Sequence, residues 1–461
     1  MYNIDFTKPC HIFFCGIGGI SMSGFAHLLH TMGFTISGSD SNTSEITKQL
    51  EAEGIHISYP QAADNITTDI DLFVYTAAIH PDNPEYIKAT ELSIPLMDRA
   101  TMVGQVMKNY KNAIDISGTH GKTTTTSMVS HIFLEAGTDP TISVGGILKA
   151  IDGNIRVGHT DNFITEACEY TNSFLKFHPA VAIILNIEED HMDFFKDIND
   201  IRNSFKEFAK LVPTDGVVII NAEIDNYEEI IEHLPCKCIT YGINNKALDY
   251  NAANISYNDK GFGSYDLYNK ETFMTHINLG VVGEHNISNS LSAIACALNS
   301  SINMNDIKKG LAAFSGTVRR FEYKGTVNGF DIIDDYAHHP TEIKATLNAA
   351  KSYPHNQLWV VFQPHTYTRT KAFLSEFAQA LSLADKIILA DIYAAREPDP
   401  GDISSRNLLE ELQGLGKESY YFSSFDEIEK FLLKNCIKND LLITMGAGNV
   451  VNIADSLTKK I

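Results

Sequence analysis

The chain has 461 residues, too many for a single hydrophobic core, and this length predicts two to four domains. Its content of 44% hydrophobic and 20% charged residues is that of an ordinary globular protein. The net charge of −21, from 36 Lys and Arg against 57 Asp and Glu, excludes nucleic acid or an anionic membrane as the main partner. No apolar run approaches the length of a membrane span, so no membrane insertion is predicted.

The first residues lack the apolar stretch of a secretory signal. The seven cysteines are scattered and odd in number. Cys236 and Cys238 have the wrong spacing for a zinc knuckle, and no second pair lies nearby. These features predict free thiols and a cytoplasmic protein.

Residues 1–108 alternate short apolar strands with helical segments. The apolar pattern predicts strands at 11–15, 35–37, 71–75 and 94–97. This βαβ order is typical of a doubly wound parallel sheet, so we expect a Rossmann-like domain.

A glycine-rich turn follows the first predicted strand. Gly16, Gly18 and an acid some twenty residues later, Asp40, resemble a dinucleotide fingerprint, but Ser21 replaces its last glycine. Such a turn holds a diphosphate at a helix N-terminus and a ribose hydroxyl near the acid. A nicotinamide cofactor, a nucleotide sugar and a turn without a ligand all remain open at this point.

The central block, residues 109–312, opens with a phosphate-loop-like stretch, Gly118-Thr-His-Gly-Lys-Thr-Thr124. A strand is predicted before it, at 113–116, and a helix after it, with apolar residues recurring at helical spacing up to Gly137. Lys122 would reach the outer phosphates of a nucleotide and Thr123 would face Mg²⁺. Because Ile116 replaces the first glycine of the full motif, a threonine-rich helix start with a solvated lysine is the alternative.

Polar residues follow two further predicted strands of this block, at 162–166 and 180–185. Glu166 ends the first strand, and His191 lies in the loop after the second, between the predicted helix-start acids Asp190 and Asp193. Thr123, Glu166 and His191 can supply metal ligands, although His191 could instead cap or orient its loop. The pattern also predicts a strand at 217–220, antiparallel strands between 250 and 282, and a helix from about 283.

The third block, residues 313–461, repeats the strand–loop–helix order, with strands predicted at 331–333, 358–362, 386–390 and 441–444. His, Asp, Tyr and Arg are concentrated in the loops that follow these strands, as at 334–342 and 363–369. Ligands bind at the carboxyl ends of strands in open α/β sheets, so these loops indicate a site. A nucleotide-diphosphate fold, an ATPase-like fold and a third binding domain together suggest a ligase.

The motifs in all three blocks resemble, in order, those of the Mur ligase family. They are Gly16–Met22, Ser37–Asp40, Gly118–Thr124, Asn186–Asp193, Gly283–Asn286, Arg319–Phe321 and Asp334–Glu342. The resemblance is strongest to the members that attach L-alanine to UDP-N-acetylmuramate. It implies an α/β protein of three domains: a Rossmann-like N-terminal domain, a central phosphate-loop ATPase-like domain and a Rossmann-like C-terminal domain. It also implies ATP and Mg²⁺, and an acyl phosphate that the amine of L-alanine attacks.

The resemblance assigns roles to residues by their position in these motifs. Lys122, Glu166 and His191 would be catalytic, and Thr123, Glu166 and His191 would hold metal. The expected ATP-binding set is Gly118, Thr119, His120, Gly121, Lys122, Thr123, Thr124, His285, Asn286, Asn289, Arg319 and Arg320. The expected UDP-sugar set is Gly16, Gly18, Gly19, Ser21, Met22, Ser23, Asp40 and Arg99. Tyr336, His338 and Arg369 would surround L-alanine.

The chain departs from the family pattern in the third-domain loop, where Thr366 stands in place of the first arginine of Arg-x-x-Arg and leaves Arg369 as the carboxylate clamp. Lys206 lies in the region of a carbamylated lysine in related ligases, and no such role is assigned to it. The alternatives are a recycling ligase that adds a tripeptide to the same nucleotide sugar, a nicotinamide-dependent dehydrogenase, and a nucleotide-binding module without turnover.

Overall fold

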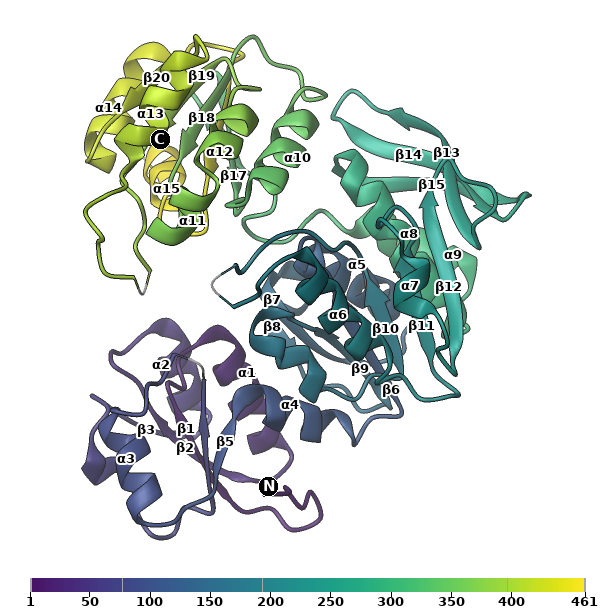
Figure 1. Ribbon diagram of the computed structural model, residues 1–461, viewed down its shortest axis with the longest axis vertical. Coiled ribbons are helices and arrows are strands. Elements are labelled where there is room, and N and C mark those ends of the chain that lie inside the picture. Colours follow the sequence, from purple (N-terminus) through teal and green to yellow (C-terminus); the bar gives the residue numbers. More distant parts are fainter. Residues whose placement is uncertain (1, 77, 193, 396, 460–461) are drawn as a thin grey trace. The chain divides into compact units, whose positions relative to one another are not determined.

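The computed structural model describes residues 2–76, 78–192, 194–395 and 397–459, and their strands form three separate sheets (Figure 1). This mixed α/β architecture confirms the predicted fold class. Contacts divide the chain into two compact units. The first holds 1–252, 268–273 and 288–311, and the second holds 253–267, 274–287 and 312–461. No helix in the described ranges is long and apolar enough to cross a membrane.

The N-terminal sheet is parallel, with the order β3-β2-β1-β4-β5. Both faces of β1 are buried, which explains its continuous apolar sequence: Ile12 and Phe14 pack in one core cluster, and Phe13 and Cys15 in another. The elements are β1 His11–Cys15, α1 Ile20–Thr31, β2 Thr35–Ser39, α2 Glu45–Ala52, β3 His56–Ser58, η1 Ala63–Asn65, β4 Leu72–Tyr75, α3 Pro84–Glu91, β5 Leu96–Asp98 and α4 Arg99–Met107.

The central sheet has ten strands in the order β15-β14-β13-β12-β11-β10-β6-β9-β7-β8. Its elements are β6 Asn112–Ser117, α5 Lys122–Glu135, β7 Thr141–Leu148, η2 Lys149–Ile151, β8 Gly153–Arg156, β9 Asn162–Glu166, η3 Tyr170–Lys176, β10 Val181–Ile184, α6 Ile198–Ala209, β11 Val217–Asn221, α7 Glu228–Ile231, β12 Lys237–Ile243, β13 Tyr250–Tyr257, β14 Phe262–Asn269, β15 Thr272–Val282, α8 Glu284–Asn299 and α9 Met304–Ala313.

Strand β6 lies between β10 and β9 and is parallel to both. Helix α5 begins at Lys122 and buries Met128, Val129, Ile132 and Phe133, the face that the sequence predicts. Gly137 has φ +67°, a conformation that favours glycine just beyond a helix end. The carboxyl ends of β6, β9 and β10 therefore present the loops at 118–121, 167–169 and 185–191 at the same edge of the sheet.

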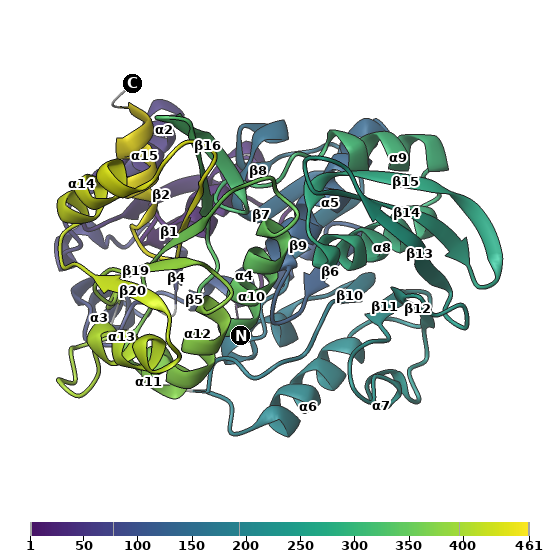
Figure 2. The same cartoon turned by 90° about the horizontal axis from the view of Figure 1, so that it is seen from above.

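The C-terminal sheet has the order β16-β17-β21-β18-β19-β20, and only its first pair is antiparallel. Helices cover both faces: α10, α12 and α13 pack in one cluster, and α14 and α15 in another (Figure 2). The elements are β16 Glu322–Val327, β17 Phe330–Asp335, α10 Pro340–Ala350, β18 Leu358–Phe362, α11 Tyr367–Ala372, α12 Leu374–Leu381, β19 Lys386–Leu389, α13 Ser405–Gly414, β20 Glu418–Tyr421, α14 Phe425–Asn435, β21 Leu441–Met445 and α15 Val451–Lys459.

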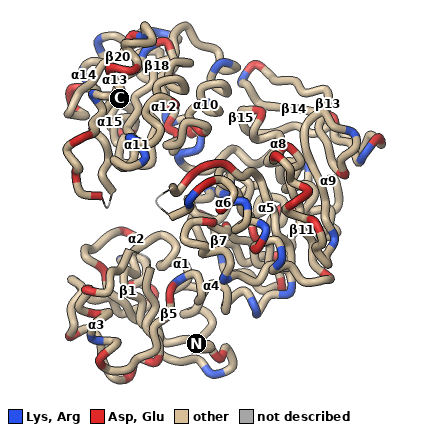
Figure 3. The backbone as a smooth tube through the Cα atoms, in the orientation of Figure 1, with Lys and Arg blue, Asp and Glu red and all other residues tan. Residues whose placement is uncertain are grey.

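Acidic residues are spread over all parts of the chain (Figure 3), in keeping with the net charge of −21. An anionic substrate must therefore be held by local groups, such as helix N-termini and single cations, against the charge of the whole molecule.

Candidate active site

The loop between β6 and α5 needs glycine at two positions. Gly118 has φ +145°, and a Cβ there would lie 2.9 Å from the Cβ of Leu185. Gly121 has φ +84° at the N-cap of α5, and a Cβ there would meet the side chain of Asn289 at 3.0 Å. With these two glycines the backbone turns sharply into the helix and leaves the first N–H groups of α5 available to an anion.

Asn186, from the loop after β10, holds this turn in place. Its Oδ1 accepts the N–H of His120 at 2.7 Å, and its Nδ2 donates to the carbonyl of His120 at 3.0 Å. Thr119 adds two contacts, because its N–H donates to the carbonyl of Asn186 at 3.2 Å and its Oγ1 accepts the N–H of Glu188 at 2.9 Å. The loops after β6 and β10 therefore form one hydrogen-bonded structure.

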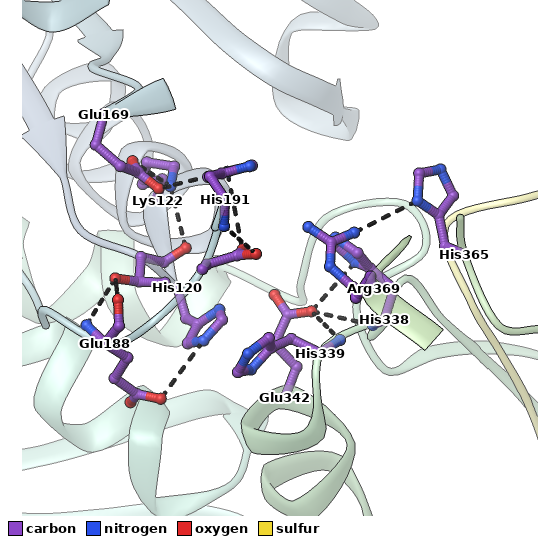
Figure 4. Close-up of polar contacts among 12 residues, drawn as sticks. His120, Lys122, Glu169, Glu188, His191, His338, His339, Glu342, His365 and Arg369 are labelled. Carbon is purple, nitrogen blue, oxygen red and sulfur yellow. Dashed lines mark hydrogen bonds and ion pairs between the residues drawn. The ribbon is translucent and has the colours of Figure 1, made fainter. Parts of the chain in front are cut away.

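Lys122 is largely buried, and its ammonium group has protein partners on the loop and beyond it (Figure 4). Nζ donates to the carbonyls of Gly118 and Thr119 and lies 3.0 Å from Oε2 of Glu169. Burial lowers the pKa of Lys122, but the charge and hydrogen bond of Glu169, together with the charges of Cys168 and Glu166, outweigh this effect and hold the pKa above its ordinary value. Lys122 is therefore a fixed cation at the N-terminus of α5.

Glu169 also lies close to His191. Its side chain is only 2% exposed, and its Oε1 lies 3.8 Å from Nε2 of His191. The imidazole stacks on the ring of Tyr170, with centroids 4.4 Å apart and planes 28° apart. Glu169 therefore lies between the lysine of the phosphate loop and the histidine of the next loop.

The sequence pattern indicates Glu166, whereas the carboxylate beside Lys122 is that of Glu169. The carboxylate of Glu166, at the end of β9, accepts the N–H of Gly145 at 2.5 Å, and a Cβ on Gly145 would meet it at 2.8 Å. The only available signal was the presence of a second acid three residues later. Pattern analysis cannot tell which of the two carboxylates turns toward Lys122, because the intervening loop decides it.

The predicted metal ligands fit a hard divalent cation when Glu169 is added to them. The structure joins a buried carboxylate, an imidazole and a lysine that would also meet phosphate, and Thr123 follows Lys122 at the start of α5. Carboxylate and hydroxyl oxygens suit Mg²⁺, and an imidazole is acceptable beside them. Asp190 lies 3.8 Å from Nε2 of His191, while Asp193 lies outside the described residues.

The remaining predicted ATP contacts are divided between the two compact units. Asn289, on α8, borders Gly121, whereas the side chain of Asn286 donates to the carbonyl of Val282 at 2.7 Å. Burial lowers the pKa of His285 to about 4, and the charge of Arg320 acts in the same direction. His285 is therefore a neutral imidazole at pH 7. Thr124 lies in the first turn of α5.

The neighbouring arginines of the C-terminal domain have different environments. Arg319 donates to Asp334 at 2.9 Å and to the carbonyls of Gly448 and Gly446 at 2.9 and 2.7 Å. These contacts occupy the guanidinium on three sides within its own domain. Arg320 lies over the ring of Tyr336 and is 3.7 Å from Glu342, so it is less tightly held.

The predicted amino-acid-binding residues all belong to the C-terminal domain, and Figure 4 shows two of them, His338 and Arg369, beside His365. The ring of His338 contacts those of Tyr336 and His365 edge to face at 5.5 and 5.6 Å, and Nη1 of Arg369 lies 3.4 Å from Nδ1 of His365. Burial lowers the pKa of His338 to about 4 against the opposing effect of Glu342. The cluster thus has neutral His338 near the cation of Arg369.

Thr366 has a structural role at the position where the family pattern has arginine. It is the N-cap of α11, and its Oγ1 accepts the N–H of Arg369 at 3.4 Å. Its φ of +66° is unusual for a β-branched residue, and the carbonyl of Tyr393 accepts its N–H at 2.9 Å. The helix that carries Arg369 therefore starts from a strained residue held by its neighbours.

In the N-terminal domain, Asp40 lies against the glycine-rich turn, and its expected contact with a ribose hydroxyl stays a prediction. Its Oδ2 accepts the N–H of Gly18 at 2.9 Å, and the carbonyl of Ser39 accepts the N–H groups of Gly16 and Ile17. The other predicted residues lie on α1, except Arg99, which begins α4 and acts on the pKa of Cys168. Gly19 is the N-cap of α1, Ser21 lies in its first turn, Met22 packs in the core, and Ser23 donates to the carbonyl of Ile20.

Three family models match consecutive stretches of the chain. Residues 11–111 match the Mur ligase family catalytic domain, 116–297 the Mur ligase middle domain and 319–448 the Mur ligase glutamate ligase domain. The curated UDP-N-acetylmuramate–L-alanine ligases of Lachnoclostridium phytofermentans and Agathobacter rectalis are 60% and 59% identical to this chain, with 100% of each sequence covered.

Solved structures agree with these matches. A UDP-N-acetylmuramate-alanine ligase from Thermotoga maritima is 29% identical, with 98% of each chain covered and a TM-score of 0.83. A murein peptide ligase from Psychrobacter arcticus, 24% identical over 98% of each chain with a TM-score of 0.73, shares the fold. On this evidence the chain belongs to the Mur ligase family.

Proposed function

We propose that the protein joins L-alanine to the lactyl carboxylate of UDP-N-acetylmuramate, with ATP as the energy source, during peptidoglycan precursor synthesis in the cytoplasm. The names of full-length relatives at 58–60% identity support these substrates. The structural observation that carries the proposal is Lys122, a buried cation at a helix N-terminus that pairs with Glu169 beside His191. This arrangement suits a phosphoryl group in transfer.

The proposed chemistry has two steps. A carboxylate oxygen of the nucleotide sugar attacks the γ-phosphorus of ATP, ADP leaves, and an acyl phosphate forms. The amine of L-alanine then attacks the acyl carbon, loses a proton, and expels inorganic phosphate to leave an amide. Lys122 would compensate the charge on the phosphoryl oxygens, and the N–H groups at the start of α5 would bind them.

We assign Mg²⁺ to Glu169, His191 and Thr123, with Glu166 as a further candidate ligand. When bound, the ion would neutralise charge on the transferring phosphoryl group. Oε1 of Glu169 and Nε2 of His191 are 3.8 Å apart, close enough for both side chains to hold one ion. Lys122 would then exchange part of its contact with Glu169 for phosphate oxygens, and Arg320 would be a second cation for phosphate because Arg319 is held by Asp334.

On the amine side, Arg369 would bind the carboxylate of the amino acid through two parallel hydrogen bonds. The rings of Tyr336, His338 and His365 adjoin one another beside it. His365 lies 3.4 Å from Arg369, and His338 packs between His365 and Tyr336, so these rings limit the room beside the arginine and favour a small amino acid over a tripeptide. This crowding supports L-alanine and makes the recycling ligase the second candidate.

The test is phosphate release from ATP by the purified protein with UDP-N-acetylmuramate, Mg²⁺ and one amine at a time, with the product identified by mass. We expect the highest kcat/KM with L-alanine and slower turnover with glycine and L-serine, because one methyl group contributes only about 1–3 kcal/mol. Preference for the tripeptide L-Ala-γ-D-Glu-meso-diaminopimelate would assign the protein to the recycling step. No amide with any amine would contradict the proposal.

A further inference from the structure

A buried carboxylate connects the loops at the edge of the N-terminal sheet. Glu85 is the second residue of α3 (Figure 1), and it is 0% exposed. Its Oε2 accepts the hydroxyl of Ser39 at 2.6 Å and the thiol of Cys15 at 3.1 Å. Its Oε1 accepts Nδ2 of Asn65 at 2.7 Å and the N–H of Ala62 at 3.2 Å. Four donors from three other segments meet on one side chain.

None of these four partners is a cation, so hydrogen bonds and the N-terminus of α3 stabilise the carboxylate. Burial raises the pKa of Cys15, and the charge of Glu85 acts in the same direction, so the thiol stays protonated and donates. Burying a carboxylate without a cation is unfavourable unless its acceptor sites are filled. A buried carboxylate at this position is therefore better explained by the loops that it holds than by packing alone.

The partners of Glu85 lie next to the glycine-rich turn. Cys15 ends β1 and precedes Gly16, and Ser39 ends β2 and precedes Asp40, whose carboxylate accepts the N–H of Gly18. The carbonyl of Ser39 also accepts the first two N–H groups of the turn. Glu85 thus fixes the residue before the turn and the residue before the acid that closes it.

The other two partners hold the loop after β3. Asn65 Nδ2 donates both to Glu85 and to the carbonyl of Pro60, so the loop from Pro60 to Asn65 is closed on the carboxylate. Gln61 extends the network, because its Oε1 accepts Nδ2 of Asn83 at 3.0 Å and its Nε2 lies 3.5 Å from Sγ of Cys15. Strands β1, β2 and β3 are parallel neighbours, so all three loops lie at one edge of the sheet.

We propose that Glu85 is a positioning residue for the nucleotide-sugar site, one that sets the glycine-rich turn, Asp40 and the loop from Pro60 to Asn65 in the arrangement that binds the nucleoside diphosphate. This inference rests on the proposed function, because that function places the nucleotide sugar at the turn. Glu85 acts through its four partners and is not itself a ligand. A rigid outer partner of this kind determines how well a binding loop is preorganised.

Two substitutions separate positioning from packing. Glu85→Leu keeps the volume approximately but removes one of the two acceptors of Asn65 Nδ2 and the acceptor of the Ala62 N–H. Glu85→Gln can still accept from both with its amide oxygen, while the hydroxyl of Ser39 can rotate to accept from the amide nitrogen. Binding of UDP and of UDP-N-acetylmuramate is measured by calorimetry at a temperature where each variant is folded. We expect Glu85→Leu to raise both Kd values at least about tenfold, the lower end of the effect of losing an outer partner, and Glu85→Gln to restore most of the loss.

Glu429→Leu is the matched control, because Glu429 is a buried acid of the C-terminal domain that accepts the hydroxyl of Ser456 at 2.8 Å. It should lower the Tm without changing the Kd for UDP. The Kd for ATP should stay within about twofold in every variant, since ATP is assigned to other loops. If Glu85→Leu does not fold, Asn65→Ala removes one contact and should still weaken UDP binding severalfold.

The outcomes distinguish the two proposals. Unchanged Kd values for UDP in folded Glu85→Leu, or in Asn65→Ala if that variant replaces it, would overturn the positioning role and leave the proposed function intact. Equal weakening by Glu429→Leu would also overturn it, because a general loss of stability would then explain the effect. Failure of the wild-type protein to bind either UDP compound would overturn the proposed function and this inference together.

Discussion

Glu166 and Glu169 are three residues apart, yet their carboxylates meet different groups. Glu169 contacts Lys122 and lies near His191, whereas Glu166 accepts the N–H of Gly145. We expect Glu169→Gln to lower kcat by at least about a hundredfold and to weaken Mn²⁺ binding, because a metal ligand loses its charge. Glu166→Gln should have a smaller effect, since an amide oxygen can still accept from Gly145.

Activity and Mn²⁺ binding, the latter by electron paramagnetic resonance, are measured for both variants. A larger loss of Mn²⁺ affinity in Glu166→Gln than in Glu169→Gln would assign the metal to the acid at the end of β9. Equal metal affinity in both variants and the wild type would place the ion elsewhere.

Arg369 lies in the cluster with His365 and His338 on the C-terminal domain. Arg369→Ala should raise the KM for L-alanine far more than the KM for ATP, because a charge-assisted contact of about 1.5–3 kcal/mol is lost on the amine side. Lys371→Ala, on the same helix, is the control, since Lys371 is exposed and pairs with Asp402. Steady-state kinetics with L-alanine and ATP varied in turn would measure the change in each KM separately. Equal changes in both KM values would remove Arg369 from the amino-acid site.

At the residue scale, the sequence predicts the glycines of the phosphate loop, Lys122 and the cluster around Arg369. It does not predict partners that depend on loop conformation. The side chains of Glu169, Asn186 and Glu85 contact residues that are distant in sequence, and the loop conformations decide which way they point. An acid or amide near a strand end is too common a feature to identify them.

At the scale of single strands, β6 carries a buried acid that the site does not use. Among the residues that the structure describes, neither carboxylate oxygen of Asp115 has a hydrogen-bond partner. Burial raises the pKa of Asp115 well above its ordinary value and so favours the neutral form of the carboxyl group. Asp115→Val should therefore stabilise the protein at pH 7 by about 1–3 kcal/mol, the cost of an unsatisfied buried polar group.

Asp334, on β17, is the matched control, because it is equally buried but accepts from Arg319 and Thr444. Asp334→Val should destabilise by about 3–5 kcal/mol, since it leaves the half-buried Arg319 without its carboxylate partner. The free energy of unfolding of each variant is obtained from urea titrations. A destabilised Asp115→Val would show that the carboxyl group has a favourable role in the folded state.

The same substitution has a defined pH dependence. In the unfolded chain the carboxyl group of Asp115 ionises near pH 4, but in the folded protein it keeps its proton to a higher pH. Unfolding then releases a proton, so the contribution of Asp115 to stability is most favourable below pH 4 and is lost as the pH rises toward the folded pKa. The advantage of Asp115→Val over wild type should grow across this range. A constant difference would contradict the raised pKa.

The apolar pattern predicts most strands of the three sheets within a few residues, as at β1 and β18, because buried parallel strands are continuously apolar. It does not predict the short β3 or the position of β21 between β17 and β18. Strand order depends on pairing between segments distant in sequence, and local periodicity carries no information about that pairing. The domain boundaries at 108/109 and 312/313 remain predictions.

At the scale of the whole molecule, the ligand that binds the N-terminal domain distinguishes a ligase from a dehydrogenase. UDP-N-acetylmuramate should raise the Tm and NAD should not. Ligand at about a hundred times its Kd adds near 2.7 kcal/mol to the free energy of unfolding, which a thermal melt detects. Lys122→Ala is the control. It should lose the rise in Tm caused by ATP, which is assigned to the central domain, and keep the rise caused by UDP-N-acetylmuramate. Stabilisation by NAD alone would contradict the ligand assigned to the turn from Gly16 to Gly19.

In the proposed reaction ATP phosphorylates the carboxylate of the nucleotide sugar before the amide forms. This order can be followed with UDP-N-acetylmuramate labelled with ¹⁸O in its lactyl carboxylate, together with ATP, Mg²⁺ and L-alanine. The carboxylate oxygen that attacks phosphorus leaves with it, so the released inorganic phosphate should carry one ¹⁸O atom for each amide formed. Lys122→Ala should give neither amide nor labelled phosphate. Amide formation with the label in AMP, or with unlabelled phosphate, would contradict the account.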